Sequence, residues 1–181
     1  MTAELDSRSI SDGVLLLRPH DEEDIVPHVA GEDDEVRHWL WNDVNLKSTV
    51  EKFTRVLEQW QEEWRTGAGH RSWAVRELTS DTLVGVVDVR DRGEGSVNVS
   101  VAIWPEHRGK GYATRAIKLA AQYAHERMGL SRTVAVIDTE NGASRRAAEK
   151  AGFVFDGSAE SWEYGAEDAT GVMLRYVLRL G

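Results

Sequence analysis

The sequence contains no cysteine among its 181 residues. Neither a disulfide framework nor a thiolate metal site can therefore exist. The six histidines do not replace the missing thiolates, because they are dispersed and no two of them lie four residues apart, on one face of a helix, as a zinc site would need. We expect no metal.

Positive net charge and long apolar runs are also lacking. The formal net charge of -9 argues against a nucleic-acid partner, because phosphate binding needs a basic patch. It is compatible with a cationic substrate, although many cytosolic proteins are simply acidic. No apolar run approaches the roughly 20 residues that span a bilayer, and residues 1–11 lack the basic and apolar segments of a signal peptide. We expect a cytoplasmic protein with no membrane partner.

The length fits a single domain over residues 1–181. Periodicity and turn residues predict strands at residues 14–18, 72–77, 82–90, 96–104, 132–138, 153–162 and 169–180. They predict helices at residues 21–28, 32–41, 49–65, 113–127 and 143–151, and Pro27 is expected to end or kink the first of these. This order predicts an α/β (α+β) fold, a mixed sheet with helices packed against it.

The first informative motif, RGKGYA at residues 108–113, lies between a predicted strand and a long helix. A helix N-terminus offers unpaired N–H groups and a partial positive charge, so it binds phosphates. Gly109 and Gly111 allow positive φ angles and a close approach of the backbone. Arg108 and Lys110 would add positive charge at the rim. The alternative is a glycine-containing turn with no ligand.

Two other phosphate motifs are excluded. A P-loop needs G-x-x-x-x-G-K-[ST], which the sequence does not contain. A dinucleotide fingerprint needs a third glycine where this chain has Thr114, and the regular βαβ setting is missing as well.

The second motif, ENGAS at residues 140–144, follows a predicted strand and opens a helix. Asn141 or Ser144 could simply cap that helix. The amide of Asn141 can also donate to and accept from an amide-bearing ligand.

Together the two motifs resemble the GNAT acetyltransferase superfamily, and within it the RimJ/RimL-like branch. The family pattern [RQ]-x-x-G-x-[GA] is met by residues 108–113. The second signature, E-N-x-x-S followed by E-K-x-G-F, is met by Glu140, Asn141, Ser144, Glu149, Lys150, Gly152 and Phe153. The resemblance spans about residues 14–178. It implies a GNAT fold, with a V-shaped splay between the two central parallel strands of a mixed sheet.

The resemblance further implies an acetyl-CoA-dependent N-acetyltransferase, with acetyl-CoA as co-substrate. The coenzyme pyrophosphate would lie on the backbone of Arg108, Gly109, Lys110, Gly111, Tyr112, Ala113 and Thr114. The strand carrying Val101 and Ile103 would pair with the pantetheine arm, Asn141 would bond its amide, and Ser144 would lie near the sulfur as a proton donor. Backbone near Ile103 would stabilise the oxyanion.

The general base departs from the common family pattern, because Asn98 stands where many relatives carry glutamate. The resemblance to the RimL-like branch points to Glu163 instead, with Glu160 close by. The alternative is that both are solvated acids in a terminal hairpin.

Trp39, Trp41 and Trp73 could line the acceptor pocket or belong to the core, with Trp39 and Trp41 the stronger candidates.

Two functions stay open at this point. One is an enzyme that acetylates a primary amine, either a protein N-terminus or a small molecule. The other is a catalytically degenerate acyl-CoA-binding module that acts as a sensor or partner domain, which Asn98 favours. We expect a monomer or a homodimer.

Overall fold

The computed structural model describes residues 6–41, 45, 47–160 and 172–180, which form one mixed sheet covered by helices. Its strands are β1 (Ile10–Ser11), β2 (Leu15–Pro19), β3 (His70–Glu77), β4 (Thr82–Gly93), β5 (Ser96–Ile103), β6 (Arg132–Asp138), β7 (Val154–Ser158) and β8 (Met173–Arg179). The helices are α1 (Ile25–Gly31), α2 (Asp34–Trp41), α3 (Val50–Thr66), α4 (Tyr112–Met128) and α5 (Gly142–Lys150), with short 3₁₀ turns η1 (Glu22–Asp24) and η2 (Pro105–His107).

The predicted α/β class is confirmed, and most predicted elements are present. The sequence predicted that Pro27 would end or kink its helix. In the structure Pro27 instead lies in the first turn of α1. The N–H groups of a first turn have no partner inside the helix, so a proline there loses nothing. The two-residue strand β1 was not predicted, because so short a segment carries no periodicity.

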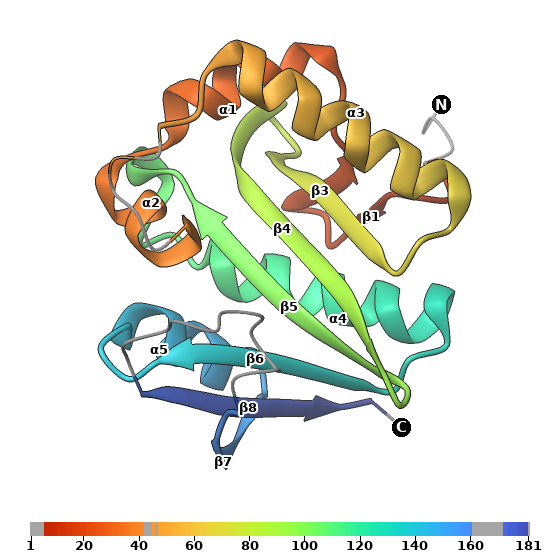
Figure 1. Cartoon of the computed structure of the whole chain (residues 1–181), viewed down its shortest axis with the longest axis vertical. Helices are drawn as coiled ribbons and strands as arrows, with labels where there is room; N and C mark the ends of the chain where they lie inside the picture. Colours follow the sequence, from red (N-terminus) through yellow and green to blue (C-terminus); the bar gives the residue numbers. More distant parts are fainter. Residues whose placement is uncertain (1–5, 42–44, 46, 161–171, 181) are drawn as a thin grey trace.

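The central feature of the sheet is a gap between β5 and β6. The strand order is β1-β2-β3-β4-β5-β6-β8-β7. β5 and β6 pair in parallel over three residues, Ser96 to Asn98 against Arg132 to Val134. Beyond them β5 stays paired with β4 as far as Ile103, while β6 stays paired with β8. The two strands diverge in Figure 1, so the predicted V-shaped splay is confirmed.

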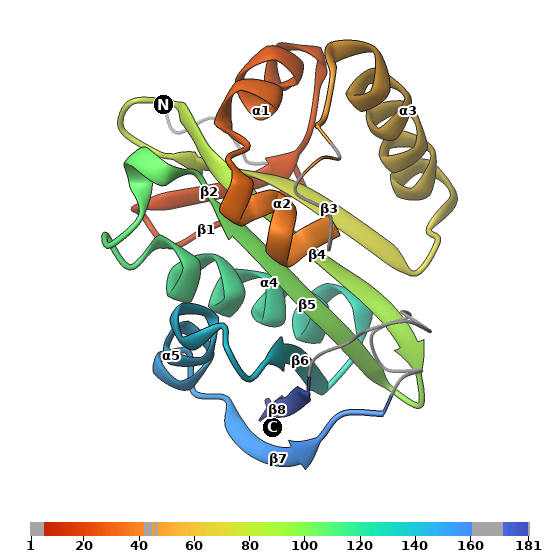
Figure 2. The same cartoon turned by 60° about the vertical axis from the view of Figure 1, so that its left-hand side comes forward.

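Two apolar layers cover the faces of this sheet. Val87 and Val89 of β4 belong to the core cluster that includes α4, whereas Val86 belongs to a second cluster with Val36 of α2. This alternation is what a strand buried on both faces requires. Figure 2 shows α2 in front of the central strands and α4 behind them. Within the part of the chain that the structure describes, no helix is both long and apolar enough to span a bilayer.

Candidate active site

Two adjoining cavities lie where β5 and β6 separate. The first, of about 640 Å³, lies between the diverging strands. The second, of about 400 Å³, lies at the N-terminus of α4. Both are lined by Trp39, Leu40, Val101, Asn141 and Ser144. These residues therefore mark a junction at which contents of one cavity would meet contents of the other.

The N-terminus of α4 presents a row of free backbone donors to the second cavity. Gly109 and Gly111 adopt φ angles of 76° and 77°, which favour glycine. A Cβ at either position would meet nothing within 4 Å, so conformation and not crowding requires glycine there. Among the described residues, nothing bonds the N–H groups of residues 109–114; the first helical bond runs from the Arg115 N–H to the Gly111 carbonyl, at 3.2 Å. Such a row can bind an anion.

Positive charge at this cavity comes from other side chains than the sequence suggested. The guanidinium of Arg108 is bound by Asp33 and Glu35 and is therefore already neutralised. Lys110 does not line the cavity, and its ammonium lies over the Tyr112 ring at 5.9 Å. The expectation that these two cations charge the rim is wrong for Arg108.

Two cations to which the sequence analysis gave no role in binding the coenzyme line the second cavity instead. Arg146 and Lys150 lie one turn apart on α5. Neither forms an ion pair with any described residue. Their spacing of four residues, on the helix that the second motif opens, was the signal that could have identified them as neighbours on one face.

The open edge of β5 offers backbone groups to a ligand. The Trp104 N–H donates to the Val84 carbonyl of β4, at 2.9 Å. The direction of the backbone groups alternates along an antiparallel strand. The backbone N–H and C=O groups of Val101 and Ile103 therefore point away from β4, toward the gap. β6 pairs with β5 only as far as Asn98. The N–H groups of Val101 and Ile103 therefore face the space that an extended ligand would fill.

The cap of α5 is Asn141 and not Ser144. The Asn141 Oδ1 accepts from the Ser144 N–H at 3.0 Å. The Ser144 hydroxyl forms no hydrogen bond with a described residue and lines both cavities. The Asn141 amide nitrogen remains as a donor toward the junction.

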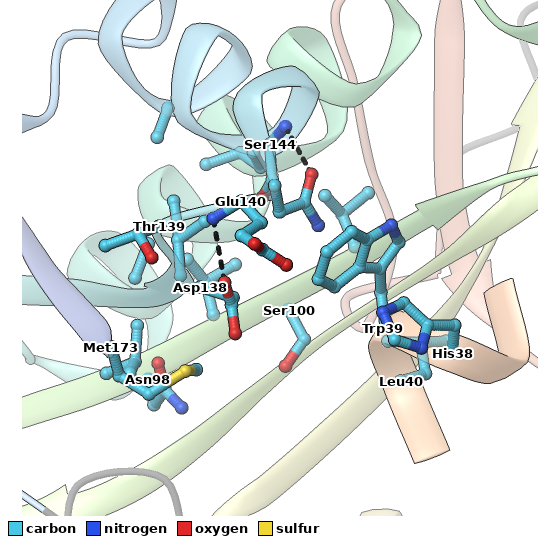
Figure 3. Close-up of a pocket in the computed structure, with 18 of the residues that line it drawn as sticks. His38, Trp39, Leu40, Asn98, Ser100, Asp138, Thr139, Glu140, Ser144 and Met173 are labelled. Atoms are coloured by element: carbon cyan, nitrogen blue, oxygen red, sulfur yellow. Dashed lines mark hydrogen bonds between the residues drawn. The ribbon is translucent and has the colours of Figure 1, made fainter. Parts of the chain in front are cut away.

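Carboxylates provide the negative charge of the first cavity. Asp138 and Glu140 both line it, and the Asp138 Oδ1 accepts from the Glu140 N–H at 2.8 Å. Figure 3 shows their carboxyl groups and the Trp39 indole directed toward the middle of the cavity. Asn98 also lines it, and its Oδ1 is buried without a hydrogen-bond partner in the described structure. The sequence analysis missed Asp138, although its place at the end of a strand, just before the second motif, was a signal.

The remaining candidates fall in different places. Glu163 and the side chain of Trp41 lie outside the described residues. Glu160 is exposed and lines neither cavity. Trp73 is fully buried against the rings of Trp64 and Tyr123, with centroid distances of 5.4 and 5.0 Å, so it belongs to the core and not to a pocket.

One acidic group elsewhere has the spacing of a metal site but a structural role. Oxygen atoms of Asp21, Glu23 and Asp24 lie within 4.8 Å of one another. Arg18 and Arg76 pair with Asp24, at 2.9 and 2.6 Å. These guanidinium groups already balance the buried carboxylate.

Comparison with known proteins agrees with this geometry. The model of the acetyltransferase (GNAT) domain family matches residues 14–154. The chain is 26% identical to the uncharacterized N-acetyltransferase YoaA of Bacillus subtilis over 122 residues, 66% of this chain and 68% of that protein. It is 36% identical to the spermidine N(1)-acetyltransferase of Escherichia coli over 75 residues, 41% of this chain and 38% of that one.

Solved structures share the fold. The ribosomal-protein-S5-alanine acetyltransferase of Vibrio fischeri superimposes with a TM-score of 0.75 and 18% identity, over 94% of this chain and 96% of that one. The residues that the family model matches include β5, β6, the N-terminus of α4 and Asn141. The chain therefore belongs to the GNAT acetyltransferase family and is an acetyl-CoA-dependent N-acetyltransferase that acts on an amine.

Proposed function

We propose that the protein transfers the acetyl group of acetyl-CoA to a primary amine by direct attack, through a tetrahedral intermediate. The observation that carries this proposal is the junction of the two cavities, which Val101, Asn141 and Ser144 share. A coenzyme in the second cavity and an amine in the first would meet there. Holding both reactants in contact removes much of the entropic barrier to a bimolecular reaction.

The second cavity has the groups that a coenzyme A would need. The free N–H groups of residues 109–114 suit a pyrophosphate. Arg146 and Lys150 would face its negative charge. The pantetheine arm would extend along the open edge at Val101 and Ile103, as an added strand, and would receive a bond from the Asn141 amide nitrogen.

The chemistry requires few protein groups. A neutral amine attacks the thioester carbonyl, and a backbone N–H at the Ile103 end of β5 would stabilise the oxyanion. Attack forms the C–N bond and gives a tetrahedral oxyanion, and the C–S bond breaks when this intermediate collapses to the amide and the thiolate. The Ser144 hydroxyl would give its proton to the departing thiolate. Its lack of another partner in the described structure supports this role.

An amine that arrives as an ammonium ion must lose a proton before it attacks, and Asn98 cannot accept that proton at neutral pH. Glu163 remains the candidate from the family pattern. Asp138 and Glu140 are further candidates, because both carboxylates line the cavity through which the amine would arrive.

The acceptor would be a cationic amine. The first cavity contains two carboxylates and no lysine or arginine among its described lining residues, so it attracts ammonium groups. The S5-alanine acetyltransferase acts on a ribosomal protein and the spermidine enzyme on a polyamine, as their names state. A protein N-terminal amine and a small polyamine are thus the acceptors to test.

The experiment follows CoA release from acetyl-CoA with spermidine, aminoglycosides and peptides that begin with alanine or serine. At least one free primary amine should raise the rate, and the same peptide with an acetylated N-terminus should not. A protein that binds acetyl-CoA but releases CoA with none of them would support the non-enzymatic acyl-CoA-binding module instead.

A further inference from the structure

Helix α2 brings an aromatic side chain to the junction of the two cavities. Val36, 4% exposed, and Leu40 pack against Val86 and Ala102 of the sheet. Trp39 lies between them in sequence and lines both cavities. The apolar contacts of α2 thus determine which face of the helix meets the sheet, and with it the direction of the indole.

A charged anchor ties the start of α2 to the end of β5. The Arg108 guanidinium donates to both carboxylate oxygens of Asp33, at 2.8 and 2.9 Å, and to Glu35 at 2.7 Å. Its Nε donates to the Ile103 carbonyl at 3.1 Å. This bidentate arrangement fixes direction as well as distance.

Asp33 also caps the helix that it anchors. Its Oδ1 accepts from the Val36 N–H at 2.9 Å. Burial would raise the pKa of the Asp33 carboxyl, but the hydrogen bonds from Arg108 and Val36 outweigh it and hold the pKa below its usual value. The carboxylate is therefore charged when it binds Arg108 at neutral pH.

The indole faces the place where a thioester would lie. Trp39 shares the junction with Val101, Asn141 and Ser144, and in Figure 3 its ring extends toward the Ser144 end of α5. We propose that Trp39 limits the length of the acyl group that the protein accepts, and that Asp33 and Arg108 are positioning residues that hold the indole there. This inference rests on the proposed function, because it takes the thioester to lie at the junction.

The test compares the binding of CoA, acetyl-CoA and butyryl-CoA by calorimetry, which requires no knowledge of the acceptor. Two extra methylenes that meet a fixed ring should weaken binding by roughly tenfold or more, so the wild type should prefer acetyl-CoA to butyryl-CoA. Trp39→Ala should bring this ratio close to one, with the affinity of the same variant for CoA as the reference for both acyl-CoAs. Trp39→Phe, a smaller change, should give an intermediate ratio.

The positioning role has its own variant and control. Asp33→Asn keeps a capping side chain but loses the charge that binds Arg108, and it should also lower the acetyl-to-butyryl ratio. Glu51→Gln makes the same change of charge on the exposed face of α3 and should keep the wild-type ratio. Melting temperatures would verify that each variant is folded.

The outcomes separate the two proposals. A wild type without preference, or a Trp39→Ala variant that keeps it, overturns the role of Trp39. An unchanged ratio in Asp33→Asn overturns the positioning role. A wild type that binds none of the three ligands overturns the proposed function and this inference together, whereas binding with an unchanged ratio overturns the inference alone.

Discussion

Asn141 holds the backbone N–H of Ser144 with its side-chain oxygen, at an N···O distance of 3.0 Å. Asn141 thus caps α5, and Ser144, which lines the first cavity, does not use its hydroxyl as a cap. Because Asn141 and not Ser144 is the cap, the proposed role of the Ser144 hydroxyl can be tested without removing the cap.

Replacing Ser144 by alanine should lower turnover by about a hundredfold, as loss of a general acid does. The melting temperature should hardly change, because Asn141 is the cap. Turnover and melting would be measured on the same preparation. Ser100→Ala removes a hydroxyl from the same cavity and should leave turnover at the wild-type level. Equal turnover in Ser144→Ala would show that the hydroxyl has no catalytic role.

Asn141 can be tested with two substitutions. Asn141→Ala removes the cap and should lower the free energy of unfolding by about 1 kcal/mol. Asn141→Asp keeps a capping oxygen but loses the amide donor, so stability should be retained while acetyl-CoA binds more weakly. If Asn141→Asp binds acetyl-CoA as the wild type does, the residue is a cap and nothing more.

Gly111→Val should abolish the stabilisation by acetyl-CoA. At about a hundred times its dissociation constant, the coenzyme should add roughly 2.7 kcal/mol to the wild type. Gly67, at the end of α3, has a φ of 75° against 77° for Gly111. Gly67→Val should therefore cost similar stability, about 1–2 kcal/mol, yet keep the coenzyme-induced shift in melting temperature. Loss of the shift in both variants, or in neither, would contradict the binding of the coenzyme pyrophosphate at the N-terminus of α4.

The general base can be located by removing one carboxylate at a time. Glu163→Gln should reduce the rate near neutral pH by ~10²–10⁴-fold, with a smaller deficit at high pH, where free amine accumulates. Acetyl-CoA binding should be nearly unchanged. Asp138→Asn and Glu140→Gln test the carboxylates that line the first cavity, and Glu160→Gln tests the neighbour of Glu163. Glu51→Gln, exposed on α3 and outside both cavities, is the control. Full activity of Glu163→Gln together with a loss in Asp138→Asn would place the base on β6.

Stability should fall as pH drops below about 6.5, the ordinary pKa of histidine. Burial of His20 holds its pKa well below that value in the folded protein. The unfolded chain then binds a proton that the folded chain does not, and stability is lost by up to about 1.4 kcal/mol per pH unit.

His20→Gln should flatten this dependence between pH 6.5 and 5.5, measured by denaturant unfolding. His38→Gln, at an exposed position, should retain it. An unchanged slope in His20→Gln would assign the effect to other groups.

The sequence by itself determined the local parts of the site. The free N–H groups at the start of α4 depend only on neighbouring residues, so two glycines before a helix were enough to predict them. The cap of α5 is local in the same way, and Asn141 was one of the two residues expected to provide it. The error at Pro27 also has a local cause. A proline is tolerated in the first turn of a helix as well as after its last turn, so the residue alone does not show which end of the helix it marks.

Tertiary structure decided which of these parts meet. Arg108 looked like a phosphate ligand until folding placed it against Asp33, 75 residues earlier. Asp138 became part of a cavity only because β6 turns away from β5 after three paired residues. Trp73 is core because Trp64 and Tyr123 close around it. Pairing between distant segments depends on how whole layers pack, and short-range residue patterns do not carry that information.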